Sequence, residues 1–304
     1  MSKKYAPISL FVYNRLKHLK ITVNSLKKNA ESKKSTLYIF SDHWRSEQDK
    51  EMVLKVRKFA STILGFKKKI TIFRNENFGL SKNIIEGVNY VLKNNNKIIV
   101  LEDDLKLSKY FLQYMNYNLN YFEKNNKIAS IHGYVYPLKN KLKLEKAFLI
   151  RGADCWGWAT WRRSWILFEP NGKKVLKNII NKNLIKEFNY NGAYDYLNML
   201  KKQILKKNDS WAIRWHAANF LKNKYTLYPR DTYVQNIGLD GSGIHNGNYF
   251  NEYNSRLSNK KFYFKKKIKI KESVEAKKEF EIFFRKINRK KPLIFFKRVL
   301  RLFS

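Results

Sequence analysis

Strand and helix signals alternate along the first hundred residues, and this alternation limits the fold more than any other feature of the sequence. Short apolar runs of strand length stand at Ile8–Tyr13, Thr36–Ser41, Ile70–Phe73 and Lys97–Leu101. Between them, apolar residues recur with helical spacing over Arg15–Asn29, Gln48–Ser61 and Leu80–Asn94. Strands that alternate with helices predict an α/β fold, with a mostly parallel mixed sheet flanked by helices.

The second half carries fewer regular patterns. Tyr110–Phe122 has helical spacing, and Ile128–His132 is an apolar run of strand length. Tryptophans concentrate in Cys155–Trp165, and glycines gather in Gly238–Gly247, which predicts a mobile loop. The residues from 260 onward are rich in lysine and arginine.

Polar side chains stand where the predicted strands end. They are Asn14 and Arg15, Asp42, Asn75–Gly79, and Glu102–Asp104. In parallel α/β sheets, ligands bind beyond the carboxyl ends of the strands. The sequence therefore predicts a ligand site at this edge of the sheet.

The acidic triplet Glu102, Asp103 and Asp104 directly follows an apolar run. A buried strand has no reason to end in three carboxylates unless a cation neutralises them. Hard oxygen ligands suit Mg²⁺ or Mn²⁺, which take the phosphate oxygens of a nucleotide diphosphate as further ligands. The alternative is a solvated turn, where acidic residues are common.

The formal net charge of +39 at pH 7 needs an explanation of its own. A basic surface that neutralises nucleic-acid phosphates is one, and attachment to an anionic membrane face is another. The third is biased residue usage, because lysine is spread evenly along the chain and fills positions that are easily solvated. The charge by itself leaves the partner open.

Cys155 is the only cysteine, so an intramolecular disulfide and a cysteine-based zinc site are excluded. No apolar run approaches the roughly 18–20 residues needed to cross a bilayer. The first residues lack the pattern of a cleavable signal. We therefore expect a protein that is made and kept in a reducing cytoplasm.

Residues 251–304 are expected to form a basic amphipathic tail. In Leu293–Phe303, apolar side chains fall on one helical side, and Lys297, Arg298 and Arg301 lie largely on the other. This pattern is typical of a helix that lies in an anionic membrane interface. The alternative is a helix that packs back on the rest of the chain, with its charges solvated.

Several segments resemble one enzyme class. LEDDL at 101–105, followed by a helix, resembles the metal-binding motif of GT-A glycosyltransferases. The form of this motif that begins with glutamate resembles that of the N-acetylglucosaminyltransferase I family in particular. NFGLSKN at 77–83 resembles a turn and helix of the bacterial family 2 transferases. The resemblance extends over roughly residues 5–250. It implies a GT-A, Rossmann-like fold.

The resemblance also implies roles for residues in the first half. Arg15 would face the donor diphosphate, Asp42 would contact the base, and Asn77 and Lys82 would lie near the donor.

Within the acidic triplet, the resemblance implies a division of roles. Asp104 would bind the metal directly. Asp103 would contact the donor ribose or sugar hydroxyls, and Glu102 would support the site.

In the second half, Asp209 would be the general base that takes the acceptor proton, and its alternative is a helix N-cap. Arg214 would bind phosphate or acceptor, or else form a surface ion pair. His245 would close over the diphosphate or complete the metal shell. Trp156 and Trp158 would form a stacking floor for the acceptor, or else belong to a core strand.

The combined expectation is an inverting hexosyl- or N-acetylhexosaminyltransferase. It would use Mn²⁺ or Mg²⁺ and a nucleotide sugar, expected to be a UDP-sugar, and act on a saccharide or lipid-linked saccharide in cell-surface glycan synthesis. Residues 1–105 would bind the nucleotide sugar and residues 106–250 the acceptor. The basic tail would hold the enzyme on the inner face of the cell membrane.

Two other classes compete with this expectation. A basic nucleic-acid-binding protein would explain the charge, but the sequence shows no zinc ligands and no readable groove-binding helix. A metal-dependent nucleotidyltransferase or phosphohydrolase would need a second cluster of ligands. Only five histidines are available, and none forms an HxH pair.

Overall fold

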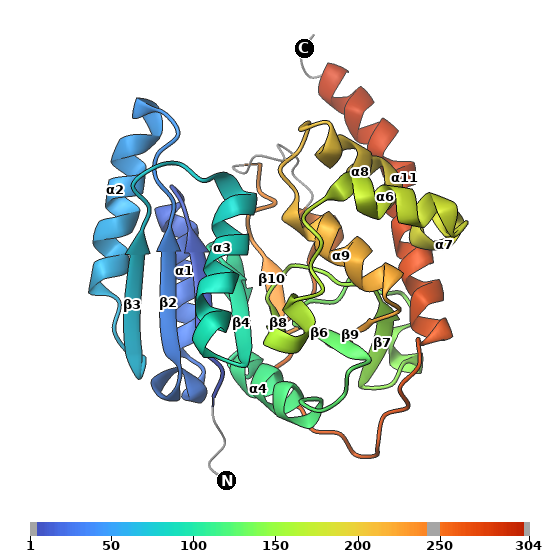
Figure 1. Ribbon diagram of the computed structural model, residues 1–304, viewed down its shortest axis with the longest axis horizontal. Helices are drawn as coiled ribbons and strands as arrows, with labels where there is room; N and C mark the ends of the chain where they lie inside the picture. Colours follow the sequence, from blue (N-terminus) through green and yellow to red (C-terminus); the bar gives the residue numbers. More distant parts are fainter. Residues whose placement is uncertain (1–4, 242–249, 301–304) are drawn as a thin grey trace.

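The computed structural model describes residues 5–241 and 250–300, and for residues 250–251 and 290–300 it describes the backbone alone. An eight-stranded sheet with the order β3-β2-β1-β4-β8-β6-β9-β7 forms the centre of the protein (Figure 1). Its strands are β1 (Ile8–Val12), β2 (Thr36–Ser41), β3 (Lys68–Phe73), β4 (Lys97–Glu102), β6 (Ile128–His132), β7 (Ala147–Arg151), β8 (Trp158–Trp161) and β9 (Tyr225–Pro229).

Parallel pairing dominates the first half of the sheet. Strands β1 to β4 are all parallel to one another, and β6 pairs in parallel with β9. Strand β8 is antiparallel to β4 and β6, and β7 is antiparallel to β9. The predicted α/β fold, with a mostly parallel mixed sheet flanked by helices, is confirmed.

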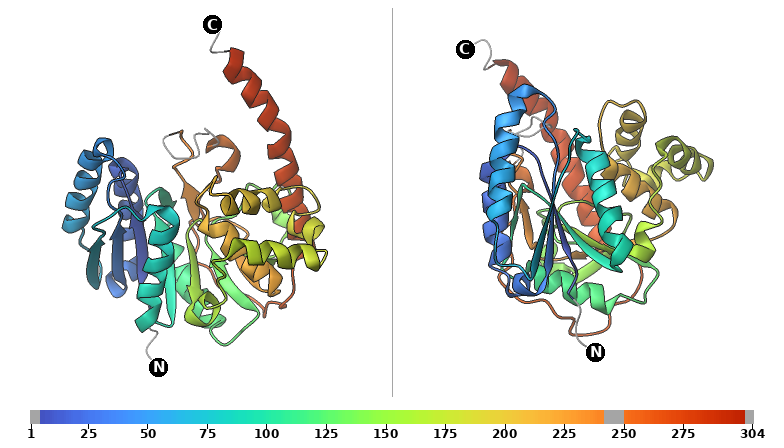
Figure 2. Two further views of the ribbon diagram at one scale, coloured as in Figure 1. Left: turned by 45° about the horizontal axis from the view of Figure 1, so that its top comes forward. Right: turned by 60° about the vertical axis from the view of Figure 1, so that its left-hand side comes forward.

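Helices cover both faces of the sheet. The helices α1 (Leu16–Lys27), α2 (Glu47–Thr62) and α4 (Phe111–Tyr121) pack on one face, and α3 (Gly79–Asn94) and α9 (Trp211–Leu221) on the other. Figure 2 shows the first part of the sheet edge-on between α2 and α3. Apolar residues fill both interfaces, and the strands in the middle are buried on both sides.

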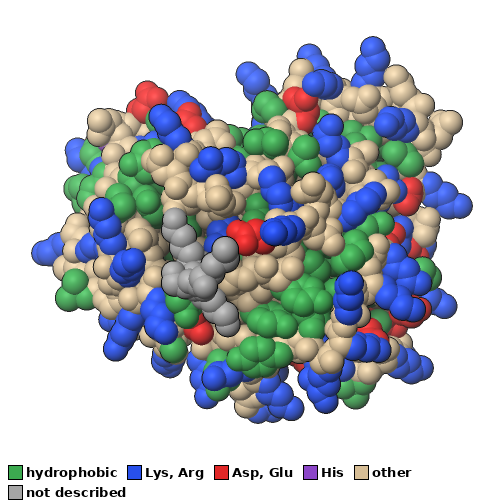
Figure 3. All heavy atoms as spheres, turned by 60° about the horizontal axis from the view of Figure 1, so that its bottom comes forward, with side chains coloured by type: hydrophobic (Ala, Val, Ile, Leu, Met, Phe, Trp, Pro, Cys, Tyr) green, Lys and Arg blue, Asp and Glu red, His purple; other side chains and the backbone are tan. Residues whose placement is uncertain are grey.

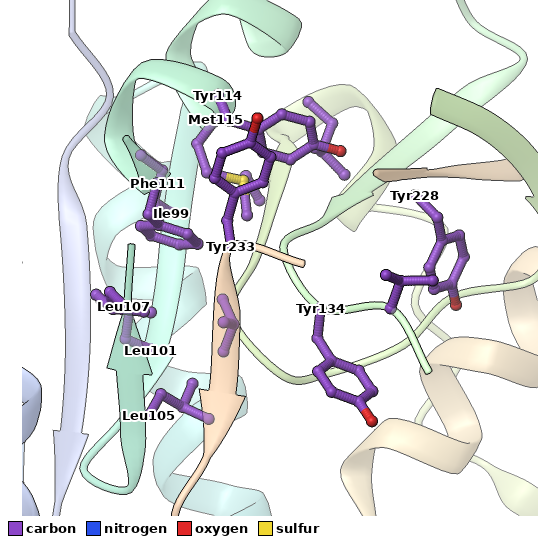
Figure 4. Close-up of a cluster of buried hydrophobic side chains, with 14 of the residues drawn as sticks. Ile99, Leu101, Leu105, Leu107, Phe111, Tyr114, Met115, Tyr134, Tyr228 and Tyr233 are labelled. Atoms are coloured by element: carbon purple, nitrogen blue, oxygen red, sulfur yellow. The ribbon is translucent and has the colours of Figure 1, made fainter. Parts of the chain in front are cut away.

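A second, two-stranded sheet lies beside the end of β4. It pairs β5 (Leu105–Leu107) with β10 (Val234–Asn236) in antiparallel register. Behind it, the rings of Tyr114 and Tyr233 stack with centroids 4.7 Å apart (Figure 4). This sheet fixes the segment around residue 237 next to the residues that follow β4.

The tryptophans of the second half form a core cluster. The Trp158 ring is fully buried, and its centroid lies 5.2 Å from that of Trp211 and 5.7 Å from that of Trp165. Trp161 is buried too, and its Nε1 donates to the carbonyl of Leu119. The interpretation of Trp158 as a core-strand residue therefore holds, and Trp161 of the same strand is buried with it. Trp158 has no exposed face for an acceptor, and its place in the stacking floor is corrected.

Four short helices lie next to α9. They are α5 (Arg162–Trp165), α6 (Gly172–Asn181), α7 (Ile185–Phe188) and α8 (Tyr196–Ile204). A separate apolar cluster ties α6, α7, α8 and α9 together, with Val175, Phe188 and Leu200 at its centre. Shorter helices are η1 (Ala30–Lys34), η2 (Lys141–Lys143) and α10 (Phe250–Tyr253).

The C-terminal helix α11 (Val274–Leu300) begins as part of the core. Phe280, Phe283, Phe284 and Ile287 are all buried, and the ring centroids of Phe280 and Phe284 each lie 5.0 Å from that of Tyr136. This part of the expected tail packs back on the domain, because its aromatic residues face the aromatic side of β7 and β9. Figure 2 shows the helix running on past the body toward its C-terminal end. The amphipathic pattern of Leu293–Phe303 lies outside the side chains that the structure describes.

On the face drawn in Figure 3, Lys and Arg side chains are scattered over the whole surface rather than gathered in one patch. This distribution fits solvated positions filled by lysine. None of the helices in the described part of the chain is both long enough and apolar enough to cross a bilayer.

Candidate functional site

The predicted site lies at the carboxyl edge of the parallel strands. The register pairs Val12 of β1 with Ser41 of β2, and Phe11 of β1 with Glu102 of β4. The backbone N of Asp42 donates to the carbonyl of Val12 over 3.2 Å. The ends of β1, β2 and β4 therefore meet, as expected for parallel strands.

Arg15 neutralises two carboxylates of the acidic triplet. Its Nη2 lies 2.7 Å from Asp103 Oδ1 and 2.9 Å from Asp104 Oδ2. Burial alone would lower the pKa of Arg15, but the carboxylates of Asp103 and Asp104 raise it above its ordinary value. One guanidinium thus serves as the cation for a group of three acids.

The triplet remains short of positive charge in spite of Arg15. Burial, followed by the charges of Asp104 and Asp103, raises the pKa of Glu102 to about 8. Burial also raises the pKa of Asp103, against the opposing effect of Arg15. Carboxyl groups with such raised pKa values would ionise more readily if a further cation were bound beside them.

The backbone of the triplet is fixed by α1 and β1. Thr22 Oγ1 donates to the carbonyl of Asp103 over 2.7 Å and accepts from the backbone N of Leu105 over 3.2 Å. The backbone N of Tyr13 donates to Asp103 Oδ2. Because Thr22 is fully buried, these bonds are shielded from water and hold the carboxylates in place.

The donor set of the triplet fits a hard divalent cation. Carboxylate oxygens are the ligands that Mg²⁺ and Mn²⁺ take, and the Arg15 guanidinium already stands between Asp103 and Asp104 as a cation. No group of three His, Cys, Asp or Glu side chains in the described residues is arranged to hold a metal. Most of the coordination of such a cation would therefore come from oxygens of a bound ligand and from water, as is usual for Mg²⁺. His245, the other predicted ligand, lies outside the described residues.

Gly238 packs directly against the site. The backbone N of Ile237 donates to the carbonyl of Asp104 over 2.8 Å. A Cβ at Gly238 would overlap Asp104 Oδ2 and would lie 2.7 Å from Arg15 Nη1. The sequence analysis placed this glycine in a predicted mobile loop. The structure shows a second reason for a glycine at this position, because its backbone closely approaches two charged side chains.

Asp42 holds the turn that follows β3. Its Oδ1 accepts from the backbone N of Phe78 over 2.8 Å and from that of His43 over 2.9 Å, and its Oδ2 lies 3.4 Å from Asn77 Nδ2. Burial raises the pKa of Asp42, and these backbone hydrogen bonds oppose the rise. Lys82 stands one turn into α3, with Nζ 3.9 Å from the centroid of the Phe78 ring. Asp42, Asn77 and Lys82 therefore lie together.

Asp209 and Arg214 meet the same turn from the other side. Asp209 Oδ2 accepts from the backbone N of Ser81 over 3.0 Å, and Arg214 Nη2 donates to Ser81 Oγ. Burial lowers the pKa of Arg214, and the charge of Asp209 opposes this. The N-cap of α9 is Ser210, whose side chain accepts from the backbone N of Ile213. Asp209 therefore caps α3 and not its own helix, and none of the contacts described joins it to the acidic triplet.

One residue that supports the site was not predicted. Asp49, in the first turn of α2, accepts from Tyr13 Oη and from Asn14 Nδ2, each over 2.8 Å. Burial, with a contribution from Asp49, raises the pKa of Tyr13 to about 12. In the sequence Asp49 resembles any acidic residue in a first helical turn, so only its spacing from Ser46 marks it.

The segment 153–157 lies near the triplet. Trp156 is partly buried, its backbone N donates to His132 Nε2, and its ring centroid lies 4.7 Å from that of Tyr134. Burial, and then the charges of Asp154, Glu102 and Asp104, raise the pKa of the Cys155 thiol. Cys155 therefore lies near both the triplet and Asp154, a carboxylate that the sequence analysis did not single out.

With this geometry described, the chain was compared with known proteins. The model of glycosyl transferase family 2 matches residues 8–181. A search of the curated proteins gives no match.

Two solved structures show partial likeness. One is the mannosyltransferase PcManGT from Pyrobaculum calidifontis in complex with GDP-Man and Mn²⁺, with 11% identity over 45% of this chain and a TM-score of 0.32. The other is TarS from S. aureus, with 16% identity over 41% of this chain and a TM-score of 0.30. The matched parts span 38% and 21% of those two proteins.

Proposed function

Because this chain belongs to glycosyl transferase family 2, we propose that it is an inverting, metal-dependent enzyme that moves a sugar from a nucleotide sugar to a hydroxyl of a saccharide. The observation that carries the proposal is the pairing of Arg15 with Asp103 and Asp104 at the edge where parallel strands end. This arrangement combines a cation that suits a diphosphate with carboxylates that suit a metal ion.

Asp104 is the proposed metal ligand, with His245 as the second candidate. Mn²⁺ or Mg²⁺ bound there would act as a Lewis acid on the leaving diphosphate. Burial raises the pKa values of Glu102 and Asp103, and a cation bound beside them would favour their ionised forms. In the part of the chain that is described, Arg15 is the basic residue that pairs with the triplet.

Donor binding is proposed for the first half, residues 1–105. Arg15 would pair with the diphosphate, since its guanidinium presents several donors in a planar fork and keeps its charge. Asp103 would then bind ribose or sugar hydroxyls. Asp42 and Asn77 at the turn after β3 would hold the base, with Lys82 nearby; the proposed base is uracil, so that the donor is a UDP-sugar.

Acceptor activation is proposed for residues 106–250, with Asp209 as general base. Its carboxylate takes the proton from the acceptor hydroxyl while that oxygen attacks the anomeric carbon and the bond to the diphosphate oxygen breaks. One displacement from the opposite face inverts the anomeric configuration. Since Oδ2 accepts from Ser81, Oδ1 is the oxygen for the proton. Arg214 would bind phosphate or acceptor from the same cluster, and Trp156 would stack on the acceptor ring.

We further propose a biological setting. The transferred unit is a hexose or an N-acetylhexosamine, as the N-acetylglucosaminyltransferase I likeness of LEDDL suggests. The acceptor belongs to a cell-surface glycan such as lipopolysaccharide or capsule, on a lipid-linked saccharide. The basic C-terminal region would hold the enzyme on the cytoplasmic face of the membrane, where anionic lipids attract lysine and arginine.

A panel of UDP-, GDP- and dTDP-sugars, each incubated with the full chain and Mn²⁺, tests this function. Release of the nucleoside diphosphate, in the presence of mixed saccharide acceptors, is the measured quantity. We expect release from at least one UDP-sugar, abolished by a metal chelator. Equal release with and without the chelator would overturn the metal dependence, and no release from any donor would overturn the activity.

A further inference from the structure

The acidic triplet and Asp154 both lie near Cys155 in a chain that is otherwise strongly basic. The sequence has 63 Lys and Arg against 24 Asp and Glu. The charges of Asp154, Glu102 and Asp104 all raise the pKa of the Cys155 thiol, and Asp103 stands between Glu102 and Asp104 in the sequence. Within the described residues, Arg15 is the only lysine or arginine paired with any of them. Such a concentration of acidic residues has an electrostatic cost that the fold does not require.

Asp154 is held by aromatic neighbours rather than by a cation. Its Oδ2 accepts from Tyr136 Oη over 2.9 Å and lies 3.4 Å from Tyr228 Oη, and its Oδ1 accepts from the backbone N of Cys155. The side chain is 18% exposed, whereas both tyrosines are buried. The carboxylate therefore has a fixed orientation and one oxygen with acceptor capacity to spare.

His132 presents an unused donor to the same carboxylate. Its ring is fully buried, its Nε2 accepts from the backbone N of Trp156, and so its proton lies on Nδ1. Nδ1 has no hydrogen-bond partner and stands 4.0 Å from Asp154 Oδ2. Burial lowers the pKa of His132, so the ring is neutral and does not cancel the charge of Asp154. Hydrogen bonds of functional groups are often long in a protein without its ligand and shorten when the ligand binds.

We propose that Asp154 and Trp156 form the acceptor subsite, in which the Asp154 carboxylate accepts hydrogen bonds from ring hydroxyls of a neutral or amino sugar. This inference rests on the proposed transferase function and goes beyond it by naming the acceptor class. Trp156 is partly exposed and follows Asp154 by two residues, and its indole ring is an apolar surface of the kind that packs on a sugar ring. An aromatic face next to a fixed acceptor matches a sugar, which has an apolar ring face and hydroxyl donors at its rim.

The charge of the subsite selects among sugars. A neutral sugar donates hydroxyls to Asp154, and an amino sugar adds an attraction to the surrounding carboxylates. A uronic acid or a phosphorylated sugar would bring another anion within a Debye length of the triplet and Asp154, where like charges repel. A metal ion and a nucleotide-sugar diphosphate add opposite charges of similar size, so they leave this preference in place.

Asp154→Asn tests the proposal, because asparagine still accepts from the tyrosines while the charge is removed. The probes are methyl glucoside, methyl glucosaminide and methyl glucuronide, with binding to the full chain measured by saturation-transfer NMR in the presence of UDP and Mn²⁺. For the wild type, we expect the glucuronide to bind at least about tenfold more weakly than the other two. For Asp154→Asn, the affinity for glucoside and glucosaminide should fall by roughly 10- to 100-fold, the loss expected for hydrogen bonds to a charged group.

Controls separate binding from structure. Glu123→Gln removes a carboxylate from an exposed turn that follows α4, and it should leave all three affinities unchanged. Asp154→Glu keeps the charge and should restore part of the binding. The affinity for UDP should be the same in all variants, which excludes general misfolding.

Three outcomes would overturn the inference. They are unchanged glycoside affinity in Asp154→Asn, glucuronide binding equal to that of the glucoside, and no binding of any of the three to the wild type. Failure of the proposed function is recognised separately, because it appears as a lack of nucleotide-sugar turnover by the wild type and does not depend on Asp154.

Discussion

The carboxylate of Asp209 lies at the first turn of α3, where its Oδ2 accepts from the backbone N of Ser81 over 3.0 Å. The two residues are separated by 128 positions in the sequence. The bond satisfies one of the free N–H groups at a helix start and fixes the orientation of the carboxylate. A side chain that is proposed as general base therefore also joins the second half of the chain to the turn after β3.

Two substitutions at Asp209 separate these roles. Asp209→Asn keeps an oxygen for Ser81 but is not basic, so the fold and donor binding should persist while kcat falls by about 10²–10⁴. Asp209→Ala should lose the cap as well, at a cost of about 1 kcal/mol in the free energy of unfolding. Turnover numbers and thermal unfolding of both variants provide the check. Unchanged turnover in Asp209→Asn would assign the base elsewhere.

Much of the first half of the fold was predictable because its signals are local. The expected strands Thr36–Ser41 and Ile128–His132 match β2 and β6, and the expected helix Leu80–Asn94 matches α3 apart from its first residue. Those segments are apolar runs, or they have a helical face that is buried. The edge at which the ends of β1, β2 and β4 meet followed from the parallel arrangement.

The remaining elements depend on contacts between distant segments. Strands β5 and β10 have three residues each and exist only because they pair with each other. The sequence analysis assigned the aromatic residues of α11 to a basic tail, because no local pattern shows that they pack against Tyr136 and Phe148. The cap that Asp209 supplies to α3 and the grouping of Asp154 with tyrosines are likewise set by tertiary packing.

Gly238→Ala should weaken the site without unfolding the chain. The added Cβ would overlap Asp104 Oδ2 and crowd Arg15 Nη1, so one of the two side chains must move. We expect the Kd for Mn²⁺-UDP to rise about tenfold, the effect of roughly 1.4 kcal/mol. Gly241→Ala is the matched control, because a Cβ there meets no atom within 4 Å, although its φ of +92° makes the backbone itself less favourable. Equal affinity in Gly238→Ala and wild type would show that the close approach does not matter for binding.

Glu102→Gln should change how stability depends on pH. The pKa of Glu102 is raised from its ordinary value of 4.5 to about 8 in the folded chain, so the folded state retains a proton that the unfolded state loses. Stability contributed by this group is therefore complete below about pH 4.5 and decreases as the pH rises toward 8. The glutamine variant should have a higher Tm than wild type at pH 8, by roughly 1–3 °C, and a smaller difference at pH 5.

That comparison is made without divalent metal, because a bound cation would favour the ionised carboxylate and reduce the difference. Glu123→Gln, at an exposed position, should follow the wild-type curve. A Glu102→Gln curve parallel to that of wild type from pH 5 to 8 would contradict the raised pKa.

The C-terminal helix sets where a truncation can be made. Removing residues 280–304 would delete the buried Phe280, Phe283, Phe284 and Ile287, and losses of about 2–5 kcal/mol for each such side chain should prevent folding. Removing residues 290–304 keeps all four and takes away five Lys and Arg. The shorter deletion should retain donor hydrolysis and bind anionic vesicles at least tenfold more weakly, measured by sedimentation. Vesicle binding equal to that of the full chain would show that this segment is not the anchor.

The most direct test of the central claim is nucleotide binding by Asp104→Ala, measured by calorimetry with UDP in the presence and absence of Mn²⁺. The Asp104 side chain is paired with Arg15 at an edge of the sheet, so its loss should leave the fold intact, as a circular dichroism spectrum would verify. The wild type should bind UDP much more tightly with Mn²⁺ than without it. Asp104→Ala should show the same weak affinity under both conditions and should transfer no sugar. If Asp104→Ala retains the metal-dependent gain in affinity and near-normal turnover, the acidic triplet is not the metal site and the proposed mechanism is wrong.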